Sequence, residues 1–393
     1  MTNYIFAEAP RQDAVITFAE LGNRELQLLK SVANWDSPNE WRRFIFDANG
    51  RGVLFKSPDR DSTLEDLIGG NYDGLQIIGA GGNLIYVQNG NAKPFILPAT
   101  ISINSPDRTN HANELKCITE LREVNDRGLF EFSHRAYVPL HGMDISEARN
   151  RKNFTAFLND AIADYRERNF RLTFVAPKLA AEGHFPGLLD NQGNPLHFQV
   201  YRVPRLSRLP RQTMDFLHHS TDILAMEGLL KRASYLMGCS LRTFHNFDLA
   251  YMDGHPGNLS FIIANGNTTL YTTDLGSMKE LSQKKFTERY KALDLYQYLA
   301  VSASSIANLL SYEGYGSPEA VGRITFIMML RVANRTFEGY FNPEIKSGAF
   351  TQPYVNFISR EFLSLALNGR LQTFAEAFEK LNVPKRVNIY QIK

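Results

Sequence analysis

The sequence predicts an α+β fold with two lobes, a β-rich N-terminal lobe and a helical C-terminal lobe. Between residues 41 and 203, short β-branched runs alternate with turn signals such as Asn49-Gly50. Beyond Pro204 the apolar residues recur at helical spacing, and one short hairpin interrupts them. The 393 residues suit one two-lobed unit or two domains. We expect an N-terminal extension at 1–40, the β-rich lobe at 41–203 and the helical lobe at 204–393.

The expected elements follow from the local patterns. Segments 43–47 and 52–57 flank Asn49-Gly50 as one hairpin, and segments 75–78 and 84–88 flank the glycines at 79–82 as another. A strand is expected at 196–203. Helices are expected near 20–32, 112–124 and 142–169 in the N-terminal half, and at 212–226, 227–246, 284–304, 317–338 and 355–382 in the helical lobe.

Composition excludes several classes of protein. The net charge is +2 from 43 basic and 41 acidic residues, so no global field points to nucleic acid or to an anionic membrane. Cys117 and Cys239 are too few for a disulfide framework or a zinc site. No stretch reaches the roughly 18 apolar residues of a membrane span, and no secretory leader is evident. We expect a cytoplasmic protein with no membrane span and no nucleic-acid partner.

The most informative segment is Asp253-Gly-His-Pro-Gly-Asn258, which precedes two short strands and then Asp274-Leu-Gly276. The strands at 259–264 and 268–273 are apolar and β-branched, and Asn265-Gly266 between them is a strong hairpin signal. A hairpin centred there pairs positions that sum to about 531 or 532, which places Asn258 across from Asp274 at roughly 5 Å. One carboxylate and one amide oxygen at the end of a hairpin suit Mg²⁺, with nucleotide phosphates completing its shell.

These residues resemble the catalytic loop of atypical members of the protein-kinase-like superfamily, in particular the aminoglycoside-phosphotransferase-like and UbiB/ABC1 kinases. The resemblance implies a two-lobed protein-kinase-like fold that uses ATP and Mg²⁺. It also implies that Asp253 accepts the proton of the attacking hydroxyl, while Asn258 and Asp274 hold the metal. His255 lies inside the loop and is expected either to orient Asp253 or contact phosphate, or equally to form a structural hydrogen bond within the turn. One position departs from the pattern, because Tyr251 stands where a histidine is usual.

The residues that would bind the nucleotide phosphates are less well defined than those that would bind the metal. Gly79, Gly81 and Gly82 are candidates for a loop over the phosphates, because glycine lets backbone N–H groups approach an anion, although a plain hairpin turn explains them equally. Lys93 is poorly placed if the chain turns at 89–91, because it then pairs with Val87, roughly 20 Å from the glycine tip.

The phosphate-binding lysine therefore needs another candidate. Lys56 ends the run Val53-Leu-Phe-Lys56, which resembles the lysine strand of kinases, with Glu65 or Glu114 as its acidic partner. Otherwise the lysine is absent and the nucleotide is held differently. Arginines recur every third residue at positions 202, 205, 208 and 211. This spacing indicates either a row of guanidinium groups that binds an anionic substrate or an acidic partner segment, or a solvated linker between the lobes.

Together these features predict an enzyme that transfers a phosphoryl group from Mg-ATP to a hydroxyl of a small molecule or protein. Three alternatives stay open. The same metal site suits transfer of AMP or another nucleotide group; a pseudokinase would bind without transfer; and the motif can be fortuitous in an unrelated α+β protein. The sequence does not identify the acceptor.

Overall fold

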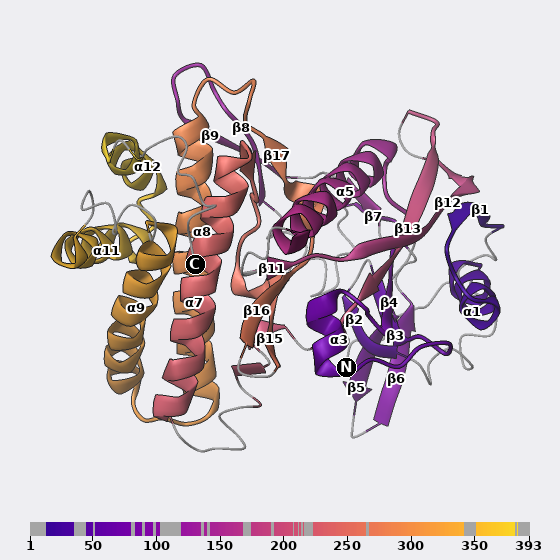
Figure 1. The fold of residues 1–393 in the computed structure, drawn as a ribbon, viewed down its shortest axis with the longest axis horizontal. Helices are drawn as coiled ribbons and strands as arrows, with labels where there is room; N and C mark the ends of the chain where they lie inside the picture. The colour runs from indigo at the N-terminus through magenta and orange to yellow at the C-terminus, as the bar shows by residue number, and fades with distance from the viewer. Residues whose placement is uncertain are drawn as a thin grey trace. The chain divides into compact units, whose positions relative to one another are not determined.

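The computed structural model describes residues 13–34, 45–49, 52–79, 83–88, 91–96, 100–102, 119–134, 137–139, 142–167, 174–189, 192–206, 208–210, 212–213, 215, 223–264, 267–341, 351–381 and 383. The chain divides into two compact units. The first consists of Met1–Arg122, Phe132–Phe157 and Pro177–Arg205; the second consists of Glu123–Glu131, Leu158–Ala176 and Leu206–Lys393. Strands dominate the first unit and helices the second, so the fold is α+β as predicted (Figure 1).

The first unit is built on a six-stranded antiparallel sheet in the order β1-β12-β13-β4-β3-β2. The long central strands β12 and β13 form a hairpin around a turn in which Gly193 has a positive φ of 82°. The edge strand β1 comes from the N-terminal region that the sequence suggested as an extension. The strands are β1 (Val15–Ala19), β2 (Ile45–Asn49), β3 (Gly52–Lys56), β4 (Gly74–Ile78), β12 (Lys178–Leu189) and β13 (Pro195–Val203).

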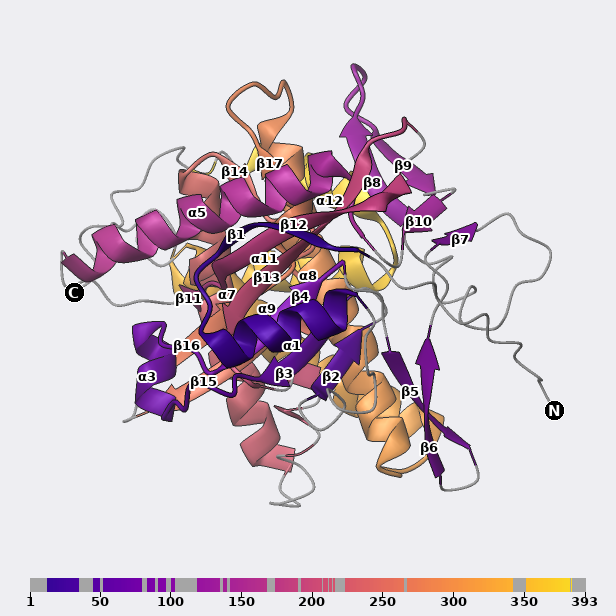
Figure 2. The same cartoon turned by 90° about the vertical axis from the view of Figure 1, so that its right-hand side faces the viewer.

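The two faces of this sheet differ in chemistry. Because side chains alternate along a strand, Phe198 and Val200 of β13 share one face with Ile77 of β4. This face forms the buried core with Leu29 and Val32 of helix α1 (Asn23–Ala33). Figure 2 shows α1 lying across the sheet.

The opposite face of β13 is polar where helix α5 (Ile145–Glu167) begins. Gln199 donates from Nε2 to the carbonyl of Ala148 on α5 at 2.8 Å, and Tyr201 donates its hydroxyl proton to Gln199 Oε1 at 2.7 Å. Burial raises the pKa of Tyr201 well above its usual value, so its hydroxyl stays neutral. This face is thus fixed by hydrogen bonds, whereas the α1 face is fixed by apolar packing.

Two expectations for the β-rich region are wrong. Strand β4 pairs with β3 and β13, not with β5 (Asn83–Gln88), so the predicted hairpin around the glycines at 79–82 does not form. Instead β5 pairs with β6 (Asn91–Ile96) across the 89–90 turn, and Lys93 lies opposite Tyr86 rather than Val87. The shorter elements of this unit are α3 (Leu64–Gly69), β7 (Thr100–Ser102) and β10 (Tyr137–Pro139), of which the two strands pair with each other.

The helix predicted at 112–124 is also wrong over the part that the structure describes. Residues Thr119–Val124 form strand β8, which pairs with β9 (Phe130–His134). The turn between them is built by Asn125, whose Oδ1 accepts from the N–H groups of Arg127 and Leu129, both at 3.0 Å. Gly128 follows with a positive φ of 76°. This turn signal favours a hairpin over a continuous helix.

The second unit is a helical assembly around a small hairpin. Within the described residues its helices include α7 (Ile223–Asn246), α8 (Thr287–Tyr312), α9 (Pro318–Tyr340), α11 (Gln352–Leu367) and α12 (Leu371–Lys380). The segment predicted as one helix at 355–382 is two, because the chain turns at Gly369, where φ is +67°. Aromatic rings of α9, α11 and α12 form the core, with Phe362 4.6 Å from Phe374 and 5.4 Å from Phe337 between ring centroids.

Candidate active site

The predicted hairpin is present and its register is close to that expected. Strands β15 (Leu259–Ala264) and β16 (Asn267–Thr272) pair antiparallel, with Leu259 opposite Thr272. The ladder continues one step further, since the N–H of Thr273 donates to the carbonyl of Asn258 at 3.1 Å. Asn258 therefore lies opposite Thr273, one residue from the predicted partner Asp274. On its other side β16 pairs in parallel with β11 (Phe174–Val175), which holds the hairpin in the unit.

Asp253 is oriented by two side chains of its own loop. His255 lies with Nε2 3.1 Å from Asp253 Oδ1, and Asn258 donates from Nδ2 to Oδ2 at 2.8 Å. The loop closes in a short 3-10 turn, η2 (Pro256–Asn258), that brings Asn258 back to Asp253. The carboxylate has about four acceptor positions, so these two bonds leave capacity for a further donor.

The backbone of this turn determines how His255 is oriented. The N–H of Gly257 donates to Nδ1 of His255 at 3.0 Å, so the neutral ring carries its proton on Nε2 and donates it to Asp253. A Cβ at position 257 would lie 2.7 Å from Cε1 of the histidine ring. Any larger residue at this position would push the His255 ring aside, because the ring folds back over Gly257.

The charges around His255 explain its titration. Burial by itself lowers the pKa of His255, but hydrogen bonding to Asp253 and the charges of Asp253 and Asp274 outweigh it, so the pKa is raised. Arg208 opposes this effect. The hydrogen bond from the Thr273 N–H to the Asn258 carbonyl holds the two ends of the hairpin segment near each other.

Asp274 has an unusual backbone. Its φ of 56° and ψ of 51° are left-handed, a conformation that costs a non-glycine residue energy and that persists where the surroundings enforce it. It is half-buried and begins a second short 3-10 turn, η3 (Leu275–Ser277). Positive φ values also occur at Met252 (65°), directly before Asp253. Met252, before the loop, and Asp274, after the hairpin, are thus both held in strained conformations.

A buried carboxylate on α8 stabilises the strained backbone conformation of Met252. Asp294 is fully buried and accepts the N–H of Met252 at Oδ1 (2.6 Å) and the N–H of Tyr251 at Oδ2 (2.7 Å). Hydrogen bonds to an ionised acceptor are the stronger kind, and in a dry site they are costly to lose. Asp294 therefore fixes the backbone that carries Asp253.

Asp294 is itself held by a chain of buried groups. His245 of α7 lies with Nε2 3.1 Å from Asp294 Oδ2, and its Nδ1 lies 2.7 Å from the hydroxyl of Tyr340 on α9. Burial lowers the pKa of His245, which favours the neutral ring. A neutral ring donates from Nε2 to the carboxylate and accepts at Nδ1 from the tyrosine. Three helices thus contribute to the support of one loop.

Tyr251, which departs from the expected motif, takes part in this support. Its hydroxyl donates to the carbonyl of Thr273, the residue before Asp274. Burial, with the nearby Asp253 and Asp274 charges, raises the pKa of Tyr251 well above its usual value, so the hydroxyl stays a donor. The tyrosine therefore links the loop to the end of β16.

Asp294, His245 and Tyr340 belong to none of the motifs recognised in the sequence. The sequence carries a sign of only one of them, because Asp294 stands between Leu293 and Leu295 in an apolar stretch of helix α8. A charged side chain at such a position is rarely fully buried unless its charge is paired or hydrogen-bonded. The hydrogen bonds that explain it join segments more than 40 residues apart, so no local pattern reveals them.

The regularly spaced arginines do not share one edge. Arg202 forms a buried ion pair with Glu25 of α1, with its Nη1 2.8 Å from Oε1, and Arg205 donates from Nε to Asp73 at 2.8 Å. Arg208 donates to the Thr273 hydroxyl at 3.3 Å, which places one cation beside the candidate site. Arg211 lies outside the described residues.

The predicted nucleotide-binding residues belong to the first unit, and the structure describes some of them. Gly79 has a φ of 85°, and a Cβ there would lie 2.7 Å from the carbonyl oxygen of His197, so packing alone requires glycine. Lys56 forms an ion pair with the exposed Asp61 and is itself 38% exposed. Gly81, Gly82 and Glu114 lie outside the described residues, as does the side chain of Glu65.

The donor set fits a hard cation that is only partly held by protein. Asn258 uses Nδ2 to bind Asp253, which orients its amide oxygen as the atom for a cation, and Asp274 adds a carboxylate. Among the residues that the structure describes, no group of three or more His, Cys, Asp or Glu could hold a metal by itself. Magnesium commonly uses one or two protein carboxylates with phosphate and water oxygens, so the residues fit Mg²⁺ bound with a nucleotide.

The comparisons with known proteins give distant matches. No family model matches the sequence, and no curated protein matches it. Among solved structures, WaaP in complex with acyl carrier protein aligns at 15% identity over 59% of this chain and 76% of that chain, with a TM-score of 0.30. The aerobactin synthetase IucA of Klebsiella pneumoniae aligns at 10% identity over 80% of this chain and 63% of that chain, with a TM-score of 0.33. Matches this distant give no information about the activity of this chain.

Helix hydropathy bears on one remaining expectation. None of the helices within the described ranges combines the length and the apolar character that crossing a bilayer requires.

Proposed function

We propose that this protein is a Mg-ATP-dependent phosphotransferase that acts on a hydroxyl group. The observation that carries the proposal is the loop Asp253–Asn258 beside Asp274, with Asp253 oriented by His255 and Asn258 and its backbone fixed by Asp294. An oriented carboxylate beside a partial metal site is what phosphoryl transfer to a hydroxyl requires, because catalysis there depends on positioning and charge neutralisation.

Each residue has a defined part in this reaction. Asp253 accepts the proton of the acceptor hydroxyl as its oxygen bonds to the γ-phosphorus and the bond from that phosphorus to ADP breaks. His255 holds the carboxylate in position by donating from Nε2. Asn258 and Asp274 would hold Mg²⁺, which when bound neutralises charge on the phosphates. Arg208 lies beside the site, where it donates to the Thr273 hydroxyl at 3.3 Å.

Two changes of a single functional group test the proposal. Asp253→Asn and Asp274→Asn should each reduce transfer from γ-labelled ATP by more than about 100-fold, while the thermal midpoint stays near that of the wild type. Asp248→Asn is the matched control, because Asp248 is exposed, lies five residues before Asp253, and has a φ of 55° that asparagine tolerates. Unreduced transfer by the Asp253 variant would exclude the proposed role.

Two parallel incubations, one with γ-labelled and one with α-labelled ATP, identify the group that is transferred. Each is carried out with the protein alone and with a cell extract as the source of acceptors. Label carried over from γ-labelled ATP indicates phosphoryl transfer, and label carried over only from α-labelled ATP indicates AMP transfer by the same site. Isothermal titration with ATP and Mg²⁺ gives a reading that needs no acceptor.

A binding module without transfer activity is the second candidate. The observation that favours it is Lys56, whose amine is paired with the exposed Asp61. Under this alternative, ATP binds in the titration but no label is transferred. An absence of both binding and transfer would exclude both candidates.

A further inference from the structure

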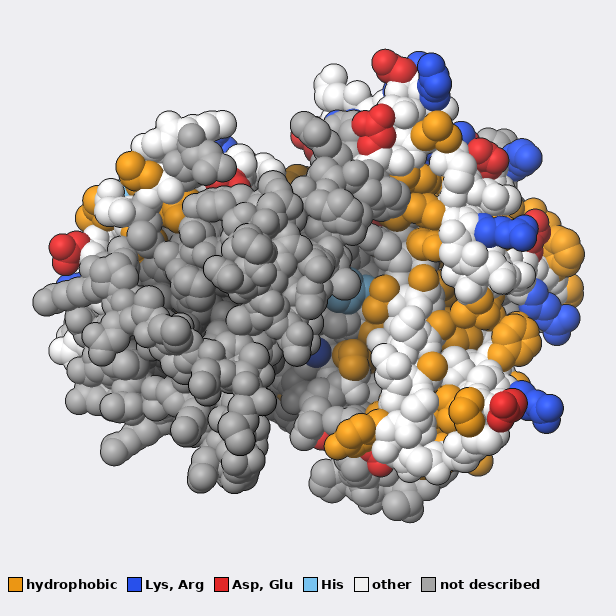
Figure 3. Space-filling model, turned by 180° about the vertical axis from the view of Figure 1, so that it is seen from behind, with side chains coloured by type: hydrophobic (Ala, Val, Ile, Leu, Met, Phe, Trp, Pro, Cys, Tyr) orange, Lys and Arg blue, Asp and Glu red, His pale blue; other side chains and the backbone are white. Residues whose placement is uncertain are grey.

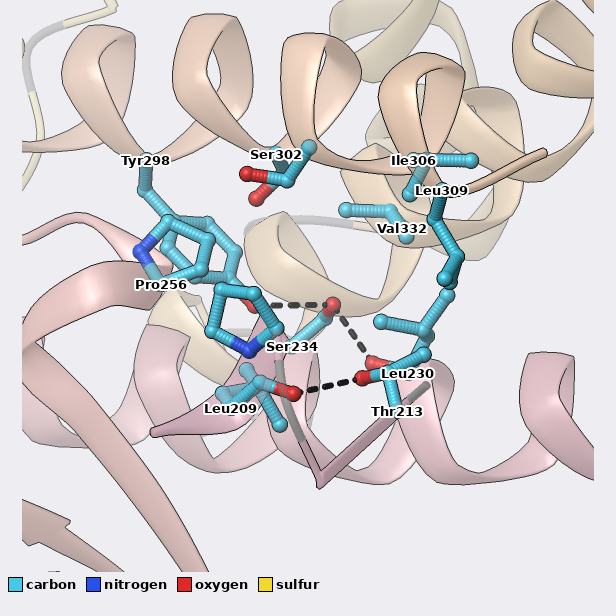
Figure 4. A pocket seen from close by; sticks show the side chains of 12 residues that line it. Leu209, Thr213, Leu230, Ser234, Pro256, Tyr298, Ser302, Ile306, Leu309 and Val332 are labelled. Atoms are coloured by element: carbon cyan, nitrogen blue, oxygen red, sulfur yellow. Dashed lines mark hydrogen bonds between the residues drawn. The ribbon is translucent and has the colours of Figure 1, made fainter. Parts of the chain in front are cut away.

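The second unit contains a pocket that adjoins the Pro256 turn but uses none of the residues assigned to metal or proton transfer. It is open on one side, and the space of about 380 Å³ between its walls includes space that belongs to the open solvent. Its walls come from α7, α8, α9, the segment around Leu209 and the turn η2, all of which belong to this unit. In Figure 4, Pro256 and Tyr298 lie at one end, and Leu309 and Val332 lie at the other.

Among the residues that the structure describes, none of those lining the pocket has a charged side chain. Seven of the twelve residues are apolar and five bear hydroxyls, namely Thr213, Ser234, Tyr298, Ser302 and Ser305. A charged ligand would be desolvated here without an ion partner, which is strongly unfavourable. The pocket therefore favours an uncharged ligand.

Three of the five hydroxyls form a cluster, namely those of Ser234, Tyr298 and Ser302. Ser234 Oγ lies 3.1 Å from the Tyr298 hydroxyl and donates to the carbonyl of Leu230 at 2.7 Å. Tyr298 also interacts with Ser302, and burial raises its pKa to about 12, so it stays neutral. This cluster offers hydrogen bonding to one polar group of a ligand, near the Pro256 end. The end formed by Ile306, Leu309 and Val332 offers mainly hydrocarbon contact, and the nearby Thr213 hydroxyl already donates to the carbonyl of Leu209 at 2.7 Å.

We propose that this pocket binds a neutral ligand with a hydrocarbon body and a single hydroxyl, with the hydroxyl at the Tyr298 cluster and the hydrocarbon toward Leu309. Occupancy acts on the candidate site, because Pro256 is both a wall of the pocket and the first residue of the turn that holds His255 and Asn258. Binding does not depend on the proposed transfer reaction.

The probe is 1-octanol, with octanoate and octylamine as charged molecules of the same chain length. We expect 1-octanol to raise the thermal midpoint in a saturable manner, since a ligand that binds only the native state stabilises it. The charged probes should bind at least tenfold more weakly. Equal stabilisation by all three would overturn the assignment.

Two serines on α8 give a matched pair of variants. Ser305 is half-buried and lines the pocket, whereas Ser304 is exposed and does not. Ser305→Phe should fill the pocket and weaken 1-octanol binding at least tenfold, and Ser304→Phe should leave it unchanged. If Ser305→Phe does not fold, as judged by circular dichroism, Ser305→Leu replaces it. Equal affinity in the two variants would exclude this pocket as the site.

The link to the loop has its own measurement. In protein labelled at histidine, 1-octanol should shift the imidazole resonance of His255 in the wild type and in Ser304→Phe, but not in Ser305→Phe. Binding without a shift would retain the site and exclude its action on the loop. Because these readings use neither ATP nor an acceptor, they are independent of the outcome for the phosphotransferase.

Discussion

Each unit contains a buried carboxylate that holds distant segments together, but the two are satisfied differently. In the first unit, Glu25 pairs with Arg202 through two bonds of 2.8 and 2.9 Å and also accepts from Ser57 and Gly22. In the second unit, Asp294 accepts two backbone N–H groups and an N–H from His245. An ion pair fixes side chains, whereas a carboxylate bound to amides fixes the path of the backbone.

This difference has a functional consequence. The Glu25 pair joins α1 to β13 and so contributes to the stability of the sheet. Asp294 instead determines the conformation of Met252, the residue before Asp253. Changes to the first carboxylate should therefore alter stability, and changes to the second should alter both stability and the geometry of the candidate site.

The largest effect is expected from Asp294→Ala. It leaves the amides of Tyr251 and Met252 without an acceptor in a dry site, which should reduce the free energy of unfolding by about 3–5 kcal/mol. Denaturant titration measures this loss. Tyr340→Phe removes only the outer hydrogen bond to His245 and should cost about 1 kcal/mol. Equal losses in the two variants would contradict the central role of Asp294.

A double substitution sharpens the contrast in the first unit. Arg202→Met alone leaves Glu25 buried without its cation and should cost about 3 kcal/mol. Adding Glu25→Leu should recover part of this loss, because two apolar side chains need no pairing. The same denaturant titration measures both variants. A double variant whose loss of unfolding free energy exceeds the sum of the losses in the two single variants would refute this account. ATP binding should persist in all three variants.

The pH dependence separates the two carboxylates further. Burial alone would raise the pKa of Glu25, but hydrogen bonds from Arg202, Ser57 and Gly22 lower it from 4.5 to about 2. Because the folded pKa is below the unfolded one, the stabilisation is complete above pH 4.5 and is lost as the pH falls toward 2. Between pH 5 and 3, the stability difference between the wild type and Glu25→Gln should shrink by about 2 kcal/mol. A difference that stays constant would show that Glu25 titrates normally.

The smallest effect concerns glycine in the candidate loop. Gly257→Ala places a Cβ against the ring of His255 and should cost about 1 kcal/mol or less, while shifting the imidazole resonance and reducing proposed transfer. Gly228→Ala on α7 meets no atom within 4 Å and should stabilise the helix by roughly 0.5–1 kcal/mol. An unshifted His255 signal in Gly257→Ala would show that the ring does not depend on this glycine.

Features specified by local sequence were predicted well. The β15–β16 hairpin follows from Asn265-Gly266 and two β-branched runs, and its register sums to 531 as expected. The β2–β3 hairpin and helix α5 follow from similarly local signals. Misreadings arose where local patterns permit two structures. The stretch at 119–124 reads as a helix by its spacing, yet it forms a strand because β9 offers a pairing partner.

The sequence alone determined the α+β class, the hairpin, and the identity of Asp253, Asn258 and Asp274 as neighbours, because a tight turn sets the register over short chain distances. The tertiary structure alone decided what holds that loop. Asp294 comes from α8, and the groups behind it come from α7 and α9, brought together by burial of apolar faces that many sequences satisfy. Likewise only the fold assigned Arg202 to Glu25, 177 residues away, because a buried charge must find its partner wherever the chain returns.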